Sequence, residues 1–202
     1  MVQGNTPQRI KWRPENRGII FNRHVALSTK DSVPKPDLIV WPETATPFNV
    51  AESEKALEVI GGLPAENGFA VIGTPIRTPK ADGGYDYANG LLAIDSKGQI
   101  TARYDKTHLV PFGEFMPLEA YLPFDKLVPG RGSFLAGPGP ATMQLGSLPS
   151  FSPLICYEVI FPSSVTASDR PAFLLNITND AWYGRSAGPH QHLAISRMRA
   201  IE

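Results

Sequence analysis

Short apolar runs that read as buried strands alternate along this chain with segments of helical periodicity, and this alternation constrains the fold more than any other feature. The strand-like runs cover residues 37–41, 69–73, 89–95, 100–104 and 173–177. The helical patterns cover residues 9–27, 51–60 and 189–202. Alternating strands and helices are typical of layered α/β architecture. Because 42% of the 202 residues are hydrophobic, the chain can bury a full core, and we predict one α/β domain over residues 1–202.

The connections between these elements carry most of the prolines. A turn at 96–98, with glycine last, predicts an antiparallel hairpin between the runs 89–95 and 100–104. The long connection 106–139 follows, and then a further short strand over 142–145 is expected. Long, proline-stiffened loops on a compact scaffold are more often functional than idle.

The only cysteine, Cys156, lies in an apolar run that extends from Ser152 to Pro162. A thiol in the turn after a short buried strand lies at the carboxyl edge of a sheet, where pockets of α/β proteins tend to lie. The backbone N–H groups that follow can act as oxyanion donors. Cys156 is therefore a candidate nucleophile, and the alternative is a small buried hydrophobe.

Two further reactive side chains also follow strands. Glu43 comes directly after the run 37–41, and Lys106 comes directly after the run 100–104. Each alone is typical of a solvated charge. Together with Cys156 they suit one chemistry, in which a carboxylate takes the thiol proton, a cation stabilises the oxyanion and the thiolate attacks a carbonyl carbon. His108 and His190 stay open as alternative bases.

The composition argues against several other functions. Nineteen basic and nineteen acidic residues cancel, which is not the pattern of a nucleic-acid binder. A single cysteine excludes an internal disulfide and a cysteine-based zinc cluster. The glycine-rich segments 130–133 and 137–140 lack the context of a nucleotide loop. His190 and His192, two residues apart on a predicted helix, face different sides, so we expect no metal and no cofactor.

The chain has no apolar run near the roughly 20 residues that span a bilayer, and its polar start is not a signal peptide. These features predict a soluble chain. The last helix, 189–202, lacks a stop signal, and residues 1–3 resemble the tail of a strand. We therefore expect an excised domain that is truncated at both ends.

Three separated motifs resemble the glutamate-lysine-cysteine triad of the nitrilase (carbon-nitrogen hydrolase) superfamily: Trp41-Pro42-Glu43, the run from Tyr104 to Glu114, and Ile155-Cys156-Tyr157-Glu158. Further segments resemble the apolipoprotein N-acyltransferase family within it: 2–5 with Trp12, 41–45, 111–114, 178–184 and 188–192. The resemblance implies an αββα four-layer sandwich. It also implies a cofactor-free reaction with Glu43 as base, Lys106 as oxyanion stabiliser and Cys156 as nucleophile.

Membership of that family implies acyl transfer in two stages. Cys156 takes an acyl chain from a phospholipid, and the thioester then passes it to the α-amino group of a diacylglyceryl-cysteine apolipoprotein. The resemblance gives supporting roles to Glu114, Tyr157 and Glu158, and it matches Trp12 and Trp182 to aromatic positions of the substrate site. It implies a bacterial inner-membrane protein with this domain on the periplasmic side.

The segment 112–128 is unusually apolar for a loop. We expect it to form an arm that accepts the acyl chain or touches the bilayer, with Phe115 and Met116 among its exposed members; the alternative is packing onto the domain's own core or a partner subunit. Two other functions stay open for the chain. One is a soluble amidase that uses the same triad and water, and the other is an idle domain that binds lipid or lipopeptide.

Overall fold

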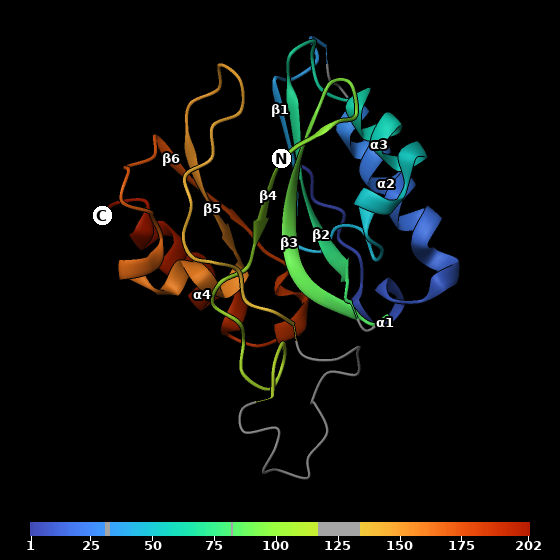
Figure 1. Cartoon of the computed structure of the whole chain (residues 1–202). Helices are drawn as coiled ribbons and strands as arrows, with labels where there is room; N and C mark the ends of the chain where they lie inside the picture. Colours follow the sequence, from blue (N-terminus) through green and yellow to red (C-terminus); the bar gives the residue numbers. More distant parts are fainter. Residues whose placement is uncertain (31–32, 82, 117–133) are drawn as a thin grey trace.

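The computed structural model describes residues 1–30, 33–81, 83–116 and 134–202 (Figure 1). Its α-helices are α1 (Gln8–Lys11), α2 (Arg17–Thr29), α3 (Glu54–Gly61) and α4 (Gly188–Arg199). Its strands are β1 (Leu38–Trp41), β2 (Phe69–Pro79), β3 (Tyr85–Asp95), β4 (Ile100–Asp105), β5 (Phe151–Ile155) and β6 (Phe173–Ile177). Short 3-10 turns are η1 (Pro14–Asn16), η2 (Val50–Glu52), η3 (Cys156–Ile160), η4 (Pro162–Ser164) and η5 (Asp180–Tyr183).

The described strands form two sheets. The first has the order β1-β2-β3-β4, with β1 parallel to β2 and with two antiparallel hairpins, β2/β3 and β3/β4. The second pairs β5 with β6 in parallel. Gly98, at φ +78°, closes the predicted β3/β4 turn in a conformation that glycine adopts without strain.

Side chains of alternate residues in the strands face opposite layers. One face of the first sheet packs on α2 and α3 through a core that includes Ile39, Trp41, Ile60, Ile72 and Ile94. Its other face packs on the second sheet through Val71, Leu91, Phe151, Ile155 and Leu175. Because β1 and the inner parts of β2 and β3 are buried on both faces, they read as nearly continuous apolar runs.

A third core, made of Leu154, Val159 and Val165, packs with Ile195 of α4 on the outer side of the second sheet. Figure 1 shows α2 and α3 on one side of the two sheets and α4 on the other. The order helices, sheet, sheet, helix is the predicted αββα sandwich, and the fold-class prediction is confirmed.

Several element boundaries differ from the sequence-based prediction. The hairpin β2/β3 pairs residues 69–79 with 85–95, which extends well beyond the predicted run 69–73. The helical segment 9–27 is interrupted by η1 at Pro14, whose ring cannot continue an α-helix. Residues 142–145 form no strand and contribute only an isolated bridge from Met143 to Phe151. At the N terminus, Val2 N–H donates to the Val40 carbonyl at 2.9 Å.

Candidate active site

Glu43 lies in the turn that follows β1, and a glycine on the neighbouring strand makes room for this turn. A Cβ atom on Gly73 would lie 2.2 Å from the Pro42 carbonyl oxygen and 2.7 Å from Glu43 Cα. Ala45 N–H donates to the Gly73 carbonyl at 2.8 Å, and Thr44 has φ +45°. The Glu43 side chain is only 4% exposed, so the turn holds a carboxylate inside the protein.

Lys106 follows β4 and is also buried. Its ammonium group lies 2.9 Å from Glu114 Oε2 and 3.8 Å from Glu43 Oε1. Burial acts to lower the pKa of Lys106, but the two carboxylates outweigh it, so its pKa is raised. Lys106 is therefore a fixed cation between two acidic side chains.

Cys156 is the first residue of η3, directly after β5. Its φ of +53° lies in the left-handed region, which non-glycine residues rarely adopt and which is often found at functional turns. The residue is 5% exposed. As predicted, Cys156 lies in a turn directly after a buried strand. The backbone of this turn is strained.

The protonation of Glu43 and Cys156 follows mainly from burial. Burial, followed by the negative charge of Glu43, raises the pKa of Cys156 to about 12, against a smaller lowering by Lys106. Burial also raises the pKa of Glu43, although Lys106 and a hydrogen bond from Asn89 oppose it. The resting thiol thus keeps its proton, and Glu43 is a carboxylate that accepts a proton more readily than an exposed glutamate.

Asn89 of β3 joins the acidic side chains, and the sequence analysis missed it. Its Nδ2 donates to Glu43 Oε1 at 2.7 Å and to Glu114 Oε1 at 2.8 Å. Its backbone carbonyl accepts from Lys106 N–H at 2.9 Å. One buried amide therefore orients the carboxylates on both sides of the lysine. In the sequence, Asn89 is distinguished only as the first residue of a predicted hairpin strand.

Glu158 is 1% exposed and ties the Lys106 loop to the Cys156 turn. Its Oε1 accepts from Thr107 N–H at 2.6 Å and from His108 N–H at 3.2 Å. Its Oε2 accepts from Ile155 N–H at 2.8 Å. Glu158 thus positions the segments that carry the cation and the thiol.

The aromatic residues singled out in the sequence lie around these groups rather than among them. Tyr157 follows Cys156 and packs edge-on against Phe161, with ring centroids 5.1 Å apart. Trp12 follows α1 and Trp182 belongs to η5, and both are 43% exposed. Exposed tryptophans next to a buried polar site offer apolar contact area for a ligand.

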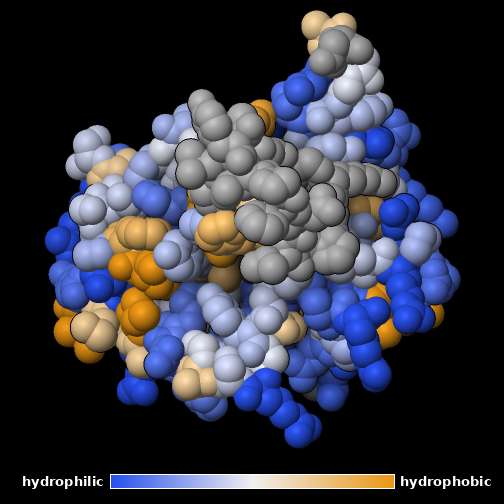
Figure 2. Space-filling model, turned by 90° about the horizontal axis from the view of Figure 1, so that it is seen from below, coloured by the Kyte–Doolittle hydropathy of each residue, from blue (hydrophilic) through white to orange (hydrophobic). Residues whose placement is uncertain are grey.

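Most of the apolar segment 112–128 lies outside the described residues, which end at Met116 and resume at residue 134. Within the described part, Phe112 is 45% exposed, but Met116 is 7% exposed, so the expectation of an exposed Met116 is wrong. Met116 packs inward as an apolar side chain ordinarily does. Figure 2 shows a surface on which apolar residues lie in separate places among hydrophilic ones.

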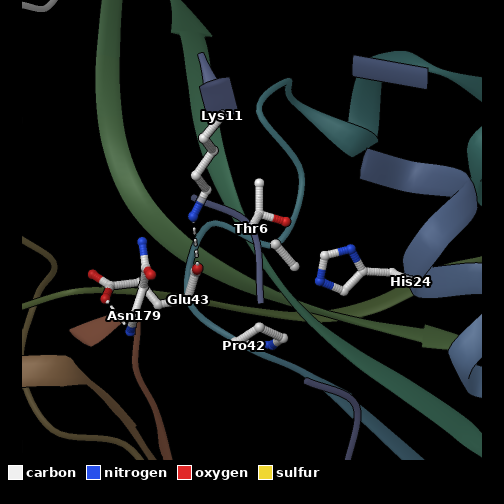
Figure 3. Close-up of a pocket in the computed structure, with 7 residues that line it drawn as sticks. Thr6, Lys11, His24, Pro42, Glu43 and Asn179 are labelled. Atoms are coloured by element: carbon white, nitrogen blue, oxygen red, sulfur yellow. Dashed lines mark hydrogen bonds between the residues drawn. The ribbon is translucent and has the colours of Figure 1, made fainter. Parts of the chain in front are cut away.

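A small cavity of about 30 Å³ adjoins Glu43 on the side of the N-terminal segment (Figure 3). Five of its seven lining residues are polar or charged; the lining consists of Thr6, Lys11, His24, Pro42, Glu43, Ala45 and Asn179. Lys11 Nζ donates to Thr44 Oγ1 at 2.7 Å and lies 3.5 Å from the Glu43 carbonyl oxygen. Asn179 N–H donates to Glu43 Oε2 at 3.0 Å. The cavity is too small for an acyl chain, and its residues support the Glu43 turn.

His192, rather than His108 or His190, is the histidine that reaches the Cys156 turn. His192 of α4 is 6% exposed, with Nε2 at 3.0 Å from the Cys156 carbonyl oxygen and Nδ1 at 2.8 Å from Asp180 Oδ1. His190 is exposed, and His108 stacks on Phe161 at 4.4 Å. The sequence prediction that His190 and His192 face different sides agrees with this burial difference.

Cys156, Asp180 and His192 offer a sulfur, an oxygen and a nitrogen that lie within 4.8 Å of one another. Such a set can in principle bind a metal ion. Both ring nitrogens of His192 are, however, directed at oxygen acceptors. A histidine ligand needs a free lone pair, so this arrangement favours hydrogen bonding over metal coordination.

Among the described residues, the helices are too short or too polar to cross a bilayer. The described part of the site thus consists of a buried carboxylate, ammonium group and thiol that follow strands of two facing sheets. Hydrogen bonds to neighbouring residues hold the turns that carry them. This arrangement can attack an activated carbonyl carbon and hold the acyl group as a thioester.

The family model of carbon-nitrogen hydrolases matches residues 2–202. Similar curated proteins include apolipoprotein N-acyltransferase of Brucella suis, 39% identical over 210 residues, covering 100% of this chain and 40% of that protein. Another is apolipoprotein N-acyltransferase of Rhizobium rhizogenes, 41% identical over 199 residues, covering 93% of this chain and 37% of that protein. The chain thus spans about 40% of the length of such relatives.

Solved structures share the fold. A CN-hydrolase superfamily protein of Xanthomonas campestris, with an arsenic adduct in its active site, matches at a TM-score of 0.61 and 21% identity, covering 100% of this chain and 70% of that chain. A carbon-nitrogen hydrolase of Helicobacter pylori matches at a TM-score of 0.59 and 17% identity, covering 92% of this chain and 65% of that chain. The fold, the motifs and the family match together establish that this chain belongs to the carbon-nitrogen hydrolase family of the nitrilase superfamily.

Proposed function

We propose that the chain is the catalytic domain of an N-acyltransferase that moves a fatty acyl chain from a phospholipid to the N-terminal α-amino group of a diacylglyceryl-cysteine apolipoprotein. The observation that carries the proposal is the buried set of Glu43, Lys106 and Cys156 in a chain 39–41% identical to proteins named apolipoprotein N-acyltransferase. The phospholipid and the lipoprotein are the partners, and no cofactor takes part. The site of action is the periplasmic face of a bacterial inner membrane.

In the first stage, Glu43 takes the Cys156 proton as the sulfur attacks the ester carbonyl carbon of the phospholipid. Lys106, held 2.9 Å from Glu114, stabilises the negative oxygen of the tetrahedral intermediate. The carbon–oxygen bond then breaks, Glu43 returns the proton to the departing alkoxide, and a lysophospholipid leaves. The acyl group stays on Cys156 as a thioester.

In the second stage, the α-amino group of the lipoprotein attacks the thioester carbonyl carbon. Glu43 accepts a proton from the attacking nitrogen and passes it to the sulfur as the carbon–sulfur bond breaks. The products are an amide and the free Cys156 thiol. Trp12 and Trp182, both partly exposed, contact the apolar parts of the substrates.

Mass spectrometry of the chain incubated with phosphatidylethanolamine vesicles tests this function. We expect a fatty-acyl adduct on Cys156, which disappears when a lipopeptide amine is added while the acylated lipopeptide forms. Loss of the adduct to water alone would indicate an amidase-like hydrolase instead. The absence of any adduct would contradict the proposal for this chain.

Two variants check the roles in the same assay. Cys156→Ser should form no adduct, because a hydroxyl is far less ionised than a thiol near neutral pH. Glu43→Gln should slow adduct formation by roughly two to four orders of magnitude, because the general base is lost. A near-normal rate for Glu43→Gln would assign the base to another residue.

A further inference from the structure

His192, which is buried, and Asp180, which is 27% exposed, form a pair beside Cys156 that the two-stage reaction does not use. The pair comes from two elements outside the triad, since His192 belongs to α4 and Asp180 to η5. The ring nitrogen, the carboxylate oxygen and the Cys156 sulfur lie within 4.8 Å of one another. At this separation a charge on the imidazole acts directly on the thiol.

The two hydrogen bonds of His192 define its protonation. The Cys156 carbonyl oxygen, 3.0 Å from Nε2, can only accept a hydrogen bond, so Nε2 must carry a proton. The Asp180 carboxylate, 2.8 Å from Nδ1, is also an acceptor, so Nδ1 must carry a proton as well. A neutral imidazole has one proton and would leave a lone pair facing one of these oxygens. Two acceptor oxygens, one at each ring nitrogen, therefore favour the imidazolium form.

The charges around the sulfur show what this cation does. The acidic side chains that bear on Cys156 are Glu43 and Asp180, and each disfavours the thiolate, whereas Lys106 favours it. When Glu43 takes the thiol proton it becomes neutral, and Asp180 is then the carboxylate that still opposes the thiolate. A protonated His192 cancels the charge of Asp180, so this carboxylate no longer opposes the thiolate.

The hydroxyl of Thr178 adds a second link to the same pair. Thr178 Oγ1 donates to Asp180 Oδ1 at 3.0 Å, and a hydrogen bond from Thr178 also lowers the pKa of Cys156. A hydroxyl has one proton, so Thr178 can donate a hydrogen bond to the Asp180 carboxylate or to the Cys156 sulfur, but not to both at once. Because His192 also donates to Asp180 Oδ1, the Thr178 proton can turn to the thiolate without leaving Asp180 unpaired.

We propose that His192 is a positioning residue that acts as an imidazolium: it holds the left-handed Cys156 turn through the Cys156 carbonyl and neutralises Asp180, and so favours the reactive thiolate. This inference deepens the proposed function and rests on Cys156 as the nucleophile. Its effect is on the thiol itself, so it can be measured without any acyl donor.

Alkylation of Cys156 by iodoacetamide, followed from pH 6 to pH 10, tests the charge. His192→Gln keeps a donor for the Cys156 carbonyl but removes the positive charge. We expect the variant to react about tenfold more slowly at pH 7 and to need a higher pH for the same rate, since a nearby cation typically changes a thiol pKa by about one unit or more. The matched control, His190→Gln, changes an exposed histidine on the same helix and should react like the wild type.

A direct measurement of the imidazole keeps the inference testable if His192→Gln fails to fold. In a ¹⁵N-labelled chain, both ring nitrogens of His192 should resonate as protonated nitrogens at pH 7, with the signals assigned by their absence from the His192→Gln spectrum or, if that variant is unfolded, by through-bond connection to the His192 backbone. A neutral tautomer at pH 7 would overturn the inference, as would wild-type alkylation by a folded His192→Gln. A missing acyl adduct in the phospholipid assay would instead count against the proposed function and would leave both of these measurements intact.

Discussion

Lys11 and Lys106 are both buried amines close to Glu43, yet their pKa values move in opposite directions. Lys106 has two carboxylates within 3.8 Å, which raise its pKa against the effect of burial. Lys11 has a hydroxyl and a carbonyl oxygen as hydrogen-bond partners, and burial lowers its pKa to about 8, with only partial opposition from Glu43. Charged Lys11 therefore weakens the fold, whereas Lys106 is stabilised as a cation.

This difference predicts how stability depends on pH. Unfolded Lys11 has a pKa near 10.5 and folded Lys11 near 8, so between these values the unfolded chain binds more protons and the free energy of unfolding rises with pH. In Lys11→Met this contribution is absent. The stability of the wild type relative to Lys11→Met should increase by about 3 kcal/mol from below pH 8 to above pH 10. Urea unfolding of both proteins at each pH measures this, and a constant difference would contradict it.

At the scale of elements, the position of Glu43 depends on how closely β2 approaches the turn after β1. Gly73 sits in β2 opposite Leu91 of β3, and the space where its side chain would be is filled by the Pro42 carbonyl. The Gly73 carbonyl in turn accepts from Ala45 N–H. At Gly73 the strand therefore supports the Glu43 turn through backbone contacts.

Gly73→Ala should displace the Glu43 turn, because a Cβ atom 2.2 Å from a backbone oxygen forces that backbone to move. We expect a loss of about 1–3 kcal/mol in the free energy of unfolding and at least a tenfold slower acylation of Cys156. Gly18→Ala is the matched control, since Gly18 lies in α2 with open space around it and alanine favours a helix. Urea unfolding and the rate of adduct formation are measured for both variants. Equal unfolding free energies and equal rates would show that the close approach of Gly73 to Pro42 is unimportant.

At the scale of the whole molecule, the predicted triad is divided between the two sheets. Glu43 and Lys106 follow strands of the first sheet, and Cys156 follows β5 of the second. The core between the sheets therefore fixes the distance from the Cys156 thiol to the Glu43 carboxylate and the Lys106 ammonium group. Phe151 lies in this core with no exposed surface and stacks on Phe173 at 5.4 Å.

Truncation of this core residue should affect the entire fold. Phe151→Ala is expected to cost about 3–5 kcal/mol in the free energy of unfolding, a large share of the roughly 5–15 kcal/mol that stabilises a typical domain. Ile100→Ala, at a position that is 39% exposed, should cost less than about 1 kcal/mol. Equilibrium unfolding in urea compares the two, and similar costs would mean that the inter-sheet core does not dominate stability.

Much of this architecture could be predicted because buried strands leave a local signal. The run 173–177 matches β6, and the run 37–41 contains β1, since strands buried on both faces are continuously apolar. The outer halves of β2 and β3 were missed because Pro75, Pro79 and polar residues break the pattern there, while backbone pairing with the neighbouring strand still holds. Cross-strand pairing of this kind has no local signature.

The polar network around the site could not be predicted for a similar reason. Asn89 reads as an ordinary strand residue, Lys11 as part of a helical segment and His192 as one of two histidines on a helix. Their roles come from contacts between distant parts of the chain, such as Asn179 N–H with Glu43 Oε2 across 136 positions. Hydrophobic periodicity reports which face is buried, and it does not report which polar groups meet inside.

The left-handed backbone conformation of Cys156 lowers folding stability at the position that carries the thiol. Glycine adopts φ +53° without strain, whereas a residue with a Cβ atom does not, so folding alone would favour glycine at this position. Cysteine nevertheless occupies this position, and a hydrogen bond between His192 and the Cys156 carbonyl oxygen helps to hold the turn. Under the proposed function, replacement of Cys156 by glycine would give a more stable but inactive protein, so activity would oppose the substitution that folding favours.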